Sequence, residues 1–257
     1  MPKVLVTGSS AGLGRMVAEE LLRSGHHVVV HARDLERGRS ALEELPPGAG
    51  LIIGDVSSIA GIRAVAERAN DEGPYDAVVH NVGVGYREPR RVQTVDGLSQ
   101  LWTINVLAPY LLTALIDRPS RLVYLSSGMH LGSGAALDDV QWANRPWSGP
   151  QAYSESKLHD VLLAFGVARR WPQTTSNVVS PGWVATRMGG SGAPDDLGQA
   201  HLTQVELAVG DSAIAAGTAG FYYHLAPGEL HPAAHDEALQ DRLLAYCADV
   251  SRVSLDA

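Results

Sequence analysis

Residues 4–16 read VLVTGSSAGLGRM, an apolar run followed by a glycine-rich turn and the start of an amphipathic helix. Glycines let a backbone approach a pyrophosphate closely, and the first turn of a helix offers free N–H groups and a positive dipole end. The spacing Gly8-x3-Gly12-x-Gly14 differs from the commoner Gly-x-Gly-x2-Gly, and taken alone it could be a plain tight turn. Its place between a first strand and a first helix favours a dinucleotide-binding site.

The rest of the chain repeats this alternation of short apolar runs and longer amphipathic stretches. We expect strands at residues 4–6, 27–31, 51–53, 76–80, 121–125 and 176–179. We expect helices at residues 12–24, 35–45, 59–70, 97–117 and 152–170. The strand runs are continuously β-branched, which is typical of parallel strands covered on both faces. The sequence therefore predicts the α/β class, as a single Rossmann-type doubly wound parallel sheet flanked by helices, with ligands at the carboxyl ends of its strands.

No repeat or linker divides the chain, so we expect one dinucleotide-binding catalytic domain over residues 1–257. Two segments interrupt the rhythm, at about residues 128–150 and 189–210, and both are rich in glycine, proline or small residues. Long loops over the ligand end of a sheet are often lids, so we expect substrate loops here, the second being a lid after the sixth strand.

Charge and composition exclude several classes of partner. The formal net charge of −8 argues against nucleic acid and anionic membranes. Cys247 is the single cysteine and cannot form an internal disulfide, which is typical of a reducing compartment. Residues 4–6 are too short for a signal peptide core, and the apolar run 161–167 is too short to span a bilayer. The sequence predicts a cytoplasmic protein with no membrane span.

The end of the second strand bears on the choice of nucleotide. NAD sites usually place a carboxylate here, whereas NADP sites place an arginine near the 2′-phosphate. Ala32 stands where that carboxylate is expected, and Arg33 follows it. Asp34 could instead cap the next helix, and Arg33 could belong to a generic basic rim. These residues favour NADP(H) and leave NAD(H) open.

Short polar residues also follow the third and fourth strands. Asp55 and Asn81 could hold adenine or brace neighbouring loops, and Asp55 could equally be the N-cap of the next helix.

Tyr153 and Lys157 are four residues apart on one face of a predicted helix, with Cβ atoms roughly 5–6 Å apart. An ammonium this close favours phenolate and is expected to lower the pKa of Tyr153 toward working pH. Such a tyrosine can give a proton to a carbonyl oxygen or take one from an alcohol. Tyr-x3-Lys alone is common in exposed helices, but here it follows a glycine-rich first turn and a fifth strand that ends in Ser126 and Ser127.

Asn105 lies on the apolar stripe of the predicted helix 97–117, where a polar side chain needs partners. Four residues later, Pro109 lacks the N–H that would bond the Asn105 carbonyl, so we expect a kink and a carbonyl able to hold a water. A satisfied buried asparagine beside an incidental kink is the plainer alternative.

These motifs, in this order, resemble the short-chain dehydrogenase/reductase family from Pro2 to about Met188. The resemblance implies an oxidoreductase that moves a hydride between nicotinamide and a carbonyl or alcohol. It implies four catalytic residues, namely Asn105 holding a water, Ser127 polarising the carbonyl, Tyr153 as acid/base, and Lys157 lowering the tyrosine pKa. The cofactor contacts implied or expected are Thr7, Gly8, Ser10, Gly12, Leu13, Gly14, Arg33, Asp55, Val56, Asn81, Gly83, Tyr153, Lys157, Pro181, Gly182, Val184 and Thr186. His80 departs from the family, which usually has an asparagine there.

Three stretches, at residues 32–38, 153–158 and 220–232, are similar to the retinol-dehydrogenase-like branch of the family. The family's usual homodimer or homotetramer pairs the helices at 97–117 and 152–170 between subunits, and the long segment before Tyr153 could cover that surface. A small-molecule carbonyl or alcohol is the expected partner.

Two other functions share parts of this pattern. A non-enzymatic NADP-binding redox sensor has the same fold but typically lacks the acid/base pair, and a methyltransferase needs no Tyr-x3-Lys. His231 and His235 have the spacing of metal ligands, but Pro232 is expected to start a helix and leave His231 outside it, so no metal is expected. The side chains of His130, Trp142, Trp147, Trp183 and Met188 could line a substrate pocket or anchor their loops.

Overall fold

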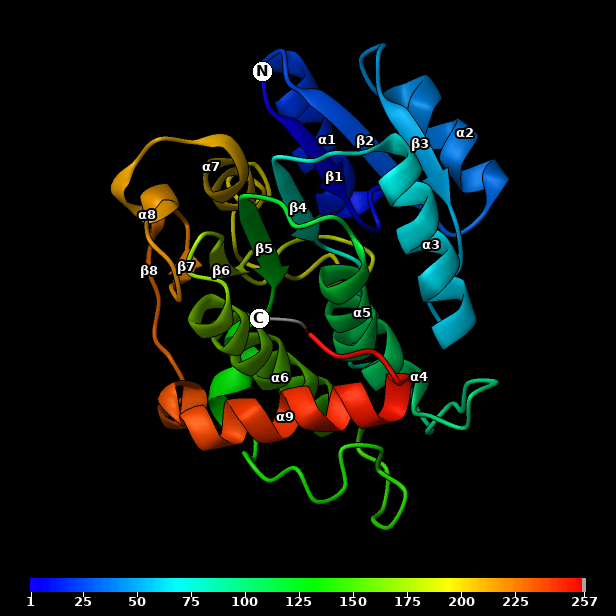
Figure 1. Ribbon diagram of the computed structural model, residues 1–257, viewed down its shortest axis with the longest axis vertical. Helices are drawn as coiled ribbons and strands as arrows, with labels where there is room; N and C mark the ends of the chain where they lie inside the picture. Colours follow the sequence, from blue (N-terminus) through cyan, green and yellow to red (C-terminus); the bar gives the residue numbers. More distant parts are fainter. Residues whose placement is uncertain (256–257) are drawn as a thin grey trace.

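The computed structural model describes residues 1–255 and contains one sheet with helices on both faces (Figure 1). The strand order is β3-β2-β1-β4-β5-β6-β7-β8. Every neighbouring pair from β3 to β7 is parallel, and β8 is antiparallel to β7. The strands are β1 (Lys3–Val6), β2 (His27–Ala32), β3 (Gly50–Ile53), β4 (Ala77–His80), β5 (Arg121–Leu125), β6 (Thr175–Ser180), β7 (Phe221–Tyr223) and β8 (Ala226–Pro227).

This order confirms the predicted doubly wound α/β fold. The strand order reverses between β1 and β4, where a crevice opens beyond the carboxyl ends of the strands. The six predicted strands form within one residue of their expected bounds. β7 and β8 were not predicted, because two or three residues are too few to show a strand pattern.

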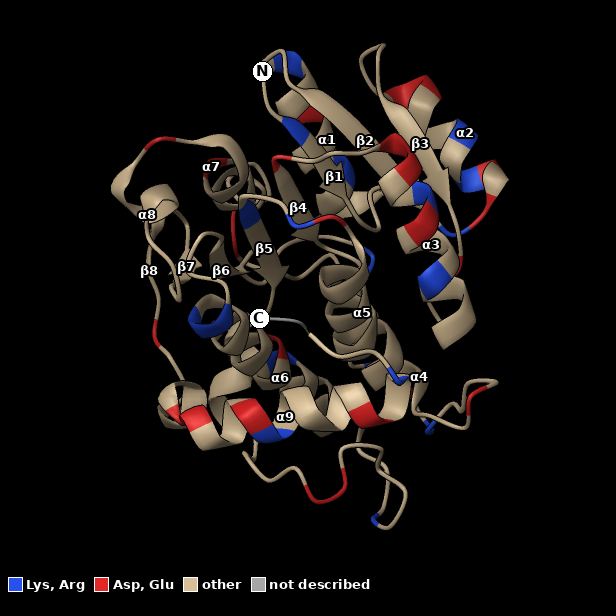
Figure 2. Ribbon diagram, in the orientation of Figure 1, with Lys and Arg blue, Asp and Glu red and all other residues tan. Residues whose placement is uncertain are grey.

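The helical segments are α1 (Gly12–Arg23), α2 (Leu35–Glu44), α3 (Ile59–Glu72), α4 (Gln100–Trp102), η1 (Thr103–Leu107), α5 (Ala108–Leu115), η2 (Gly128–Gly132), α6 (Gly149–Arg170), α7 (Leu202–Val209), α8 (Ala213–Ala216), η3 (Pro232–His235) and α9 (Glu237–Ser251). Alternate strand residues point to opposite faces of the sheet. Val4 and Val6 pack with α1 and α7, whereas Leu5 packs with α3, α5 and α6. The strands are mostly uncharged, and charged residues lie on the outer helices and loops (Figure 2).

The expected helix 97–117 is shorter and is interrupted. It begins at Gln100, because Gly97 adopts a left-handed backbone (φ +80°) in the preceding turn. Its middle part, η1, is a π-helical turn centred on Asn105. A wide turn of this kind fits the missing N–H of Pro109, so the predicted irregularity takes the form of a π-bulge rather than a simple kink.

Two further expectations about the second half of the chain are wrong in detail. The segment 189–210 is not all loop, because α7 occupies its second half and packs against α1 and β5. Pro232 starts only a short 3-10 turn, η3, and the long helix α9 begins five residues later, with Asp236 as its N-cap.

Helix α9 packs along α6 (Figure 1). The Phe165 and His235 rings lie 5.5 Å apart, and Arg169 Nε donates a 2.9 Å hydrogen bond to Gln240 Oε1. The apolar side chains in the middle of α6, Val161 to Ala164, are completely buried. This long helix is therefore enclosed by its own chain. Over residues 1–255, no helix has the length and apolar character needed to cross a membrane.

Candidate functional site

The glycine-rich turn takes a shape that its glycines make possible. Gly8 has a left-handed backbone (φ +62°), and a Cβ at this position would lie 2.7 Å from the Cα of Val82. A Cβ on Gly14 would lie 2.4 Å from Asn81 Nδ2 and 2.7 Å from the Gly8 carbonyl oxygen. Both contacts are closer than real side chains tolerate. The turn is therefore pressed against the segment that follows β4.

Thr7 and Asn81 hold this turn from behind. The buried hydroxyl of Thr7 accepts hydrogen bonds from the backbone N–H groups of Asn81 and Val82, at 3.0 and 3.1 Å. The Asn81 amide donates to the carbonyl oxygens of Thr7 and Gly8, at 3.1 and 3.2 Å. Of the two alternatives for Asn81, the structure places its side chain against the loop.

His31 is a further brace that sequence reasoning missed. Its Nδ1 accepts a 3.1 Å hydrogen bond from the Gly8 N–H, and its Nε2 lies 2.9 Å from the Gly54 carbonyl oxygen. Because Nδ1 accepts, Nε2 must carry the proton, so the ring is neutral. Burial lowers the pKa of His31 and favours this form. A histidine at the end of a strand gives no such signal in the sequence.

A cleft of about 290 Å³ opens in front of the turn. It is lined by Gly8, Ser10, His31, Arg33, Arg37, Gly54, Asp55, Val56, Ser57, Val82, Gly83, Val84, Gln100, Ile104 and Arg187. Six of the expected cofactor contacts are among these residues, namely Gly8, Ser10, Arg33, Asp55, Val56 and Gly83. The other expected contacts lie outside this lining, namely Thr7, Gly12, Leu13, Gly14, Asn81, Tyr153, Lys157, Pro181, Gly182, Val184 and Thr186.

The basic side of the cleft carries Arg33 and Arg37. Asp34, between them, is the N-cap of α2, and its Oδ1 accepts a 2.9 Å hydrogen bond from the Arg37 N–H. Its other oxygen lies 3.2 Å from Arg37 Nε. The alternative that Asp34 caps the helix is therefore confirmed, and its carboxylate is engaged there.

Asp55 does not cap α3. Ser58 is the N-cap of that helix, and its hydroxyl accepts from the Gly61 N–H at 3.1 Å. The Asp55 carboxylate instead accepts from the Ser57 N–H at 2.8 Å, with its side chain exposed at the cleft. The N-cap alternative for Asp55 is wrong.

The segment after β6 reaches the cleft through a residue that was not expected. Thr186 Oγ1 accepts a 3.2 Å hydrogen bond from the Gly189 N–H, whereas the next residue, Arg187, lines the cleft. An arginine beside the Pro-Gly turn was a weak signal in the sequence, because isolated arginines are common at protein surfaces.

Tyr153 and Lys157 meet as the helical spacing predicts. Lys157 Nζ lies 5.7 Å from the centre of the Tyr153 ring, and both side chains are buried. The ammonium donates a 2.8 Å hydrogen bond to the Leu125 carbonyl oxygen at the end of β5. A Cβ on Gly83 would lie 3.9 Å from Lys157 Nζ, so the cleft ends beside this pair.

The two serines after β5 differ in their surroundings. Ser126 is buried, and its hydroxyl donates to the Lys157 carbonyl oxygen at 2.7 Å, which fastens α6 to the sheet. The Ser127 hydroxyl accepts from the Met129 N–H at 3.3 Å, and its influence on the phenol lowers the pKa of Tyr153. Ser127 is therefore the serine beside the phenol.

The expectation of a lowered tyrosine pKa is not met. Burial raises the pKa of Tyr153, and the opposing effects of Lys157 and Ser127 do not cancel it. The free-energy cost of removing the phenolate from water is larger here than the electrostatic stabilisation that the Lys157 ammonium provides. The sequence showed the cation but not the depth at which the ring is buried.

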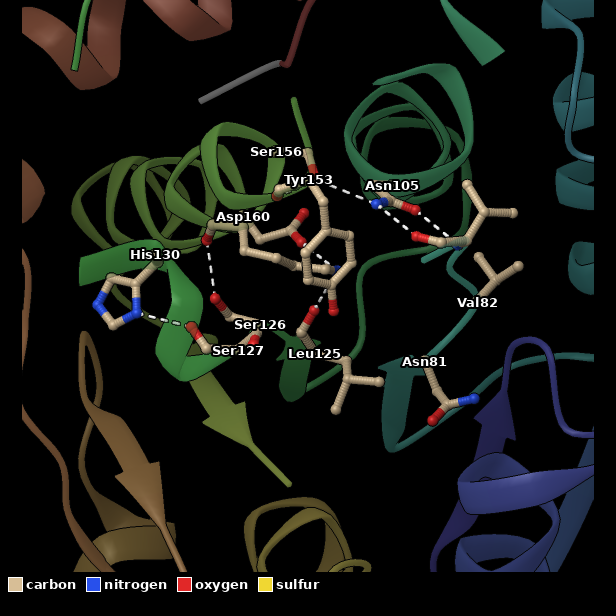
Figure 3. Close-up of polar contacts among 12 residues, drawn as sticks. Asn81, Val82, Asn105, Leu125, Ser126, Ser127, His130, Tyr153, Ser156 and Asp160 are labelled. Atoms are coloured by element: carbon tan, nitrogen blue, oxygen red, sulfur yellow. Dashed lines mark hydrogen bonds and ion pairs between the residues drawn. The ribbon is translucent and has the colours of Figure 1, made fainter. Parts of the chain in front are cut away.

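The Asn105 side chain joins three segments. Its Oδ1 accepts from the Val84 N–H at 2.8 Å, and its Nδ2 donates to the Val84 carbonyl oxygen at 3.1 Å and to Ser156 Oγ at 3.0 Å. The buried amide thus has the partners that its position demanded (Figure 3). It fixes the edge of the cleft to the helix that carries Tyr153.

The segment before α6 packs on Tyr153 through its tryptophans. Trp142 and Trp147 cluster with the Tyr153 ring, and Trp142 Nε1 donates to Glu155 Oε2 at 3.1 Å. Met188 Sδ lies 3.9 Å from the Tyr153 hydroxyl, whereas the Trp183 side chain is exposed. His130 is buried against Phe221, so it anchors its loop.

The candidate metal ligands have other partners. His231 is the N-cap of η3, and its Nδ1 accepts from the Ala233 N–H at 3.1 Å, while the ring of His235 packs near Phe165. Within residues 1–255, no three His, Cys, Asp or Glu side chains are grouped as metal ligands.

Comparison with known proteins bears on the family of this chain. A family model described as short chain dehydrogenase matches residues 2–196. Uncharacterized oxidoreductase AN7799 of Emericella nidulans is 38% identical over 99% of both chains, and short-chain dehydrogenase chyC of Penicillium rubens is 36% identical over the full length of both. Human retinol dehydrogenase 13 is 31% identical over 72% of this chain and 60% of its own length.

Solved structures share the fold. A protein of unassigned function from Mycobacterium paratuberculosis superposes with a TM-score of 0.87 at 24% identity, covering all of this chain and 96% of that one. The RhlG/NADP active-site complex of Pseudomonas aeruginosa has a TM-score of 0.68 at 22% identity, covering 87% of this chain and 96% of that one. With the family model spanning most of the sequence, this chain belongs to the short-chain dehydrogenase family.

Proposed function

We propose that this protein transfers a hydride between NADP(H) and a carbonyl or alcohol substrate, with Tyr153 as the acid/base. One observation carries the proposal: the Tyr153–Lys157 pair lies at the end of a cleft that begins at the glycine-rich turn and passes Gly83. A nucleotide in this cleft would bring its reactive end to the buried phenol. We propose a cytoplasmic location, since the single cysteine, Cys247, cannot form an internal disulfide.

The residues of the cleft fit a dinucleotide. Gly8 and Ser10 offer a close backbone approach for phosphates, and Asp55 and Val56 are placed at the far end for adenine. The bound nicotinamide supplies or accepts the hydride. Tyr153 gives its proton to the carbonyl oxygen, Ser127 orients that oxygen, and Lys157 stabilises the phenolate that results. Asn105 keeps Val84 in place and, through its backbone carbonyl, holds a water for proton return.

With the cofactor in this orientation, the Pro181-Gly182 turn, Val184 and Thr186 would contact its nicotinamide end. Gly12, Leu13 and Gly14 form the first turn of α1, whose free N–H groups would hold the phosphates. Thr7 and Asn81 act from behind, by holding the loop.

The test of this function is direct. Reduced NADP is titrated by fluorescence, and its oxidation is then followed by absorbance with a panel of aldehydes and ketones. We expect binding, and turnover with at least one carbonyl compound. Binding with no turnover on the whole panel would favour a redox sensor, and no binding would reject a nicotinamide-dependent function.

NADP(H) is preferred over NAD(H) in this proposal because of Arg33. Ala32 offers no carboxylate to a ribose diol, and the Asp34 carboxylate already caps α2. Replacing Arg33 by alanine is expected to lower kcat/KM with NADPH by about tenfold or more, since a charge-assisted contact to a phosphate contributes about 1.5–3 kcal/mol. Steady-state kinetics with NADPH and NADH measure the change, and kcat/KM with NADH should hardly alter.

Arg39→Ala is the matched control for Arg33. Arg39 lies six residues further along, on α2, and outside the cleft lining. The Arg39→Ala substitution removes the same charge and should leave kcat/KM unchanged with both NADPH and NADH. An equal loss in the two variants, or an unchanged NADPH preference in Arg33→Ala, would reject the role of Arg33.

A further inference from the structure

A buried carboxylate lies beside Lys157, on the side away from the cleft. Asp160 is three residues further along α6, and its Oδ2 accepts a 2.8 Å hydrogen bond from Lys157 Nζ. The Asp160 and Lys157 side chains are 2% and 4% exposed, so both are buried. Tyr153 and Asp160 both extend from α6 (Figure 3). The ammonium thus has two fixed acceptors, this carboxylate and the Leu125 carbonyl oxygen.

In this arrangement the Lys157 ammonium lies beside two acidic groups, the Tyr153 phenol and the Asp160 carboxyl. A neutral phenol, an ammonium and a carboxylate sum to zero charge. A phenolate, an ammonium and a carboxylate together would leave one net negative charge on three buried side chains, which is costly. The ionised state of Asp160 therefore opposes the ionised state of Tyr153, although the two acids share the same cation.

Other titratable groups face the three residues from neighbouring elements. Tyr124 on β5 has its hydroxyl 2.7 Å from Thr113 Oγ1 and its ring stacked on His80 of β4. Burial lowers the pKa of His80 to about 3, so this ring stays neutral. Tyr86 meets the Tyr153 ring edge-on, with centroids 5.7 Å apart. Burial also raises the pKa of Tyr124, so Tyr124 and His80 are neutral near pH 7, and the charges that matter are those of Tyr153, Lys157 and Asp160.

The direction of the pKa shifts agrees with this geometry. Burial raises the pKa of Asp160 to about 7, although Lys157 acts in the opposite direction. Burial lowers the pKa of Lys157, but Asp160 and Tyr153 together raise it above its ordinary value. The charge of Asp160 also adds to the raised pKa of Tyr153.

We propose that Asp160 is a positioning residue, which holds the Lys157 ammonium in place and sets the pH at which the Tyr153–Lys157 pair loses its proton. This inference rests on the proposed roles of Tyr153 and Lys157. The carboxyl group lies outside the cleft lining, and it acts through its hydrogen bond to the lysine and through its charge.

The test replaces Asp160 by asparagine, which keeps the shape of the side chain and removes its charge. Without the buried anion, the tyrosine–lysine pair should release its proton more readily. We expect the acidic limb of the kcat profile for alcohol oxidation to move to lower pH by about one unit or more. In cofactor-free protein, the tyrosinate absorbance that Tyr153→Phe abolishes should move in the same direction. KM for the alcohol should change little.

Two controls separate charge from structure. Asp160→Glu keeps the charge and should keep the pH of the limb, even if kcat falls because the longer side chain displaces Lys157. Asp241→Asn removes a carboxylate that is paired with Arg169 and Arg170 at the far end of α6, and it should change neither readout. If Asp160→Asn does not fold, a limb that moves to lower pH in Asp160→Glu overturns the proposal.

The outcomes also separate this inference from the proposed function. An acidic limb that stays at the wild-type pH in Asp160→Asn, or moves upward, overturns the role of Asp160 alone, provided that Tyr153→Phe is inactive. Turnover that survives in Tyr153→Phe instead rejects the acid/base assignment itself.

Discussion

Phenylalanine at position 153 is expected to reduce kcat by about 10³-fold or more while the protein still binds NADPH. A phenyl ring cannot give or accept the proton, and positioned acid–base catalysis contributes roughly 10²–10⁴-fold to a rate. The ring itself would keep its packing against Tyr86 and Trp142, so the fold and the cleft should be unchanged. Steady-state kinetics give kcat, and fluorescence titration gives the Kd of NADPH, which should stay within about twofold.

Tyr86→Phe is the control for this substitution. It removes a hydroxyl from the ring that meets Tyr153 edge-on, and kcat should change by less than about fivefold, because this phenol has no place in the proton path. A Tyr153→Phe variant with a near-normal rate would contradict the mechanism, since another group would then have to supply the proton.

Alanine at position 14 is expected to weaken NADPH binding by about tenfold or more and to destabilise the protein. The added methyl would overlap Asn81 Nδ2 and the Gly8 carbonyl oxygen, so the glycine-rich turn or the end of β4 must move. Overpacking of this kind costs about 1–3 kcal/mol. Chemical denaturation measures the loss of stability, and fluorescence titration measures the loss of affinity.

Gly132→Ala is the matched control for Gly14→Ala. A Cβ there meets nothing within 4 Å, and Gly132 lies in η2, away from the cleft lining. It should alter neither stability nor the Kd of NADPH by a measurable amount. If the two alanine variants bind NADPH equally well, close contact at Gly14 is not what shapes the turn.

The sequence predicted the parts of this molecule that depend on local patterns. Strands such as residues 121–125 show continuous β-branched or apolar runs, and the helix spacing of Tyr153 and Lys157 fixed their shared face. Helix α7 was missed because it lies in a segment of mixed small and polar residues, where loop and helix look alike.

Contacts between distant segments could not be predicted. The link from His31 to Gly8 and Gly54 joins three strand ends that only the folded sheet brings together. Arg187 reaches the cleft from the segment after β6, and nothing near it in the sequence marks that approach. The raised pKa of Tyr153 had the same origin, because burial is a property of the whole fold.

The packing of α9 along α6 has a consequence for how the protein behaves when diluted. The support behind Tyr153 and Lys157 comes from a segment joined covalently to the same chain, through contacts such as Arg169 with Gln240 and Phe165 with His235. A covalent neighbour has a fixed local concentration, whereas a second subunit leaves when the protein is scarce. Specific activity should therefore stay constant as the enzyme is diluted over several orders of magnitude.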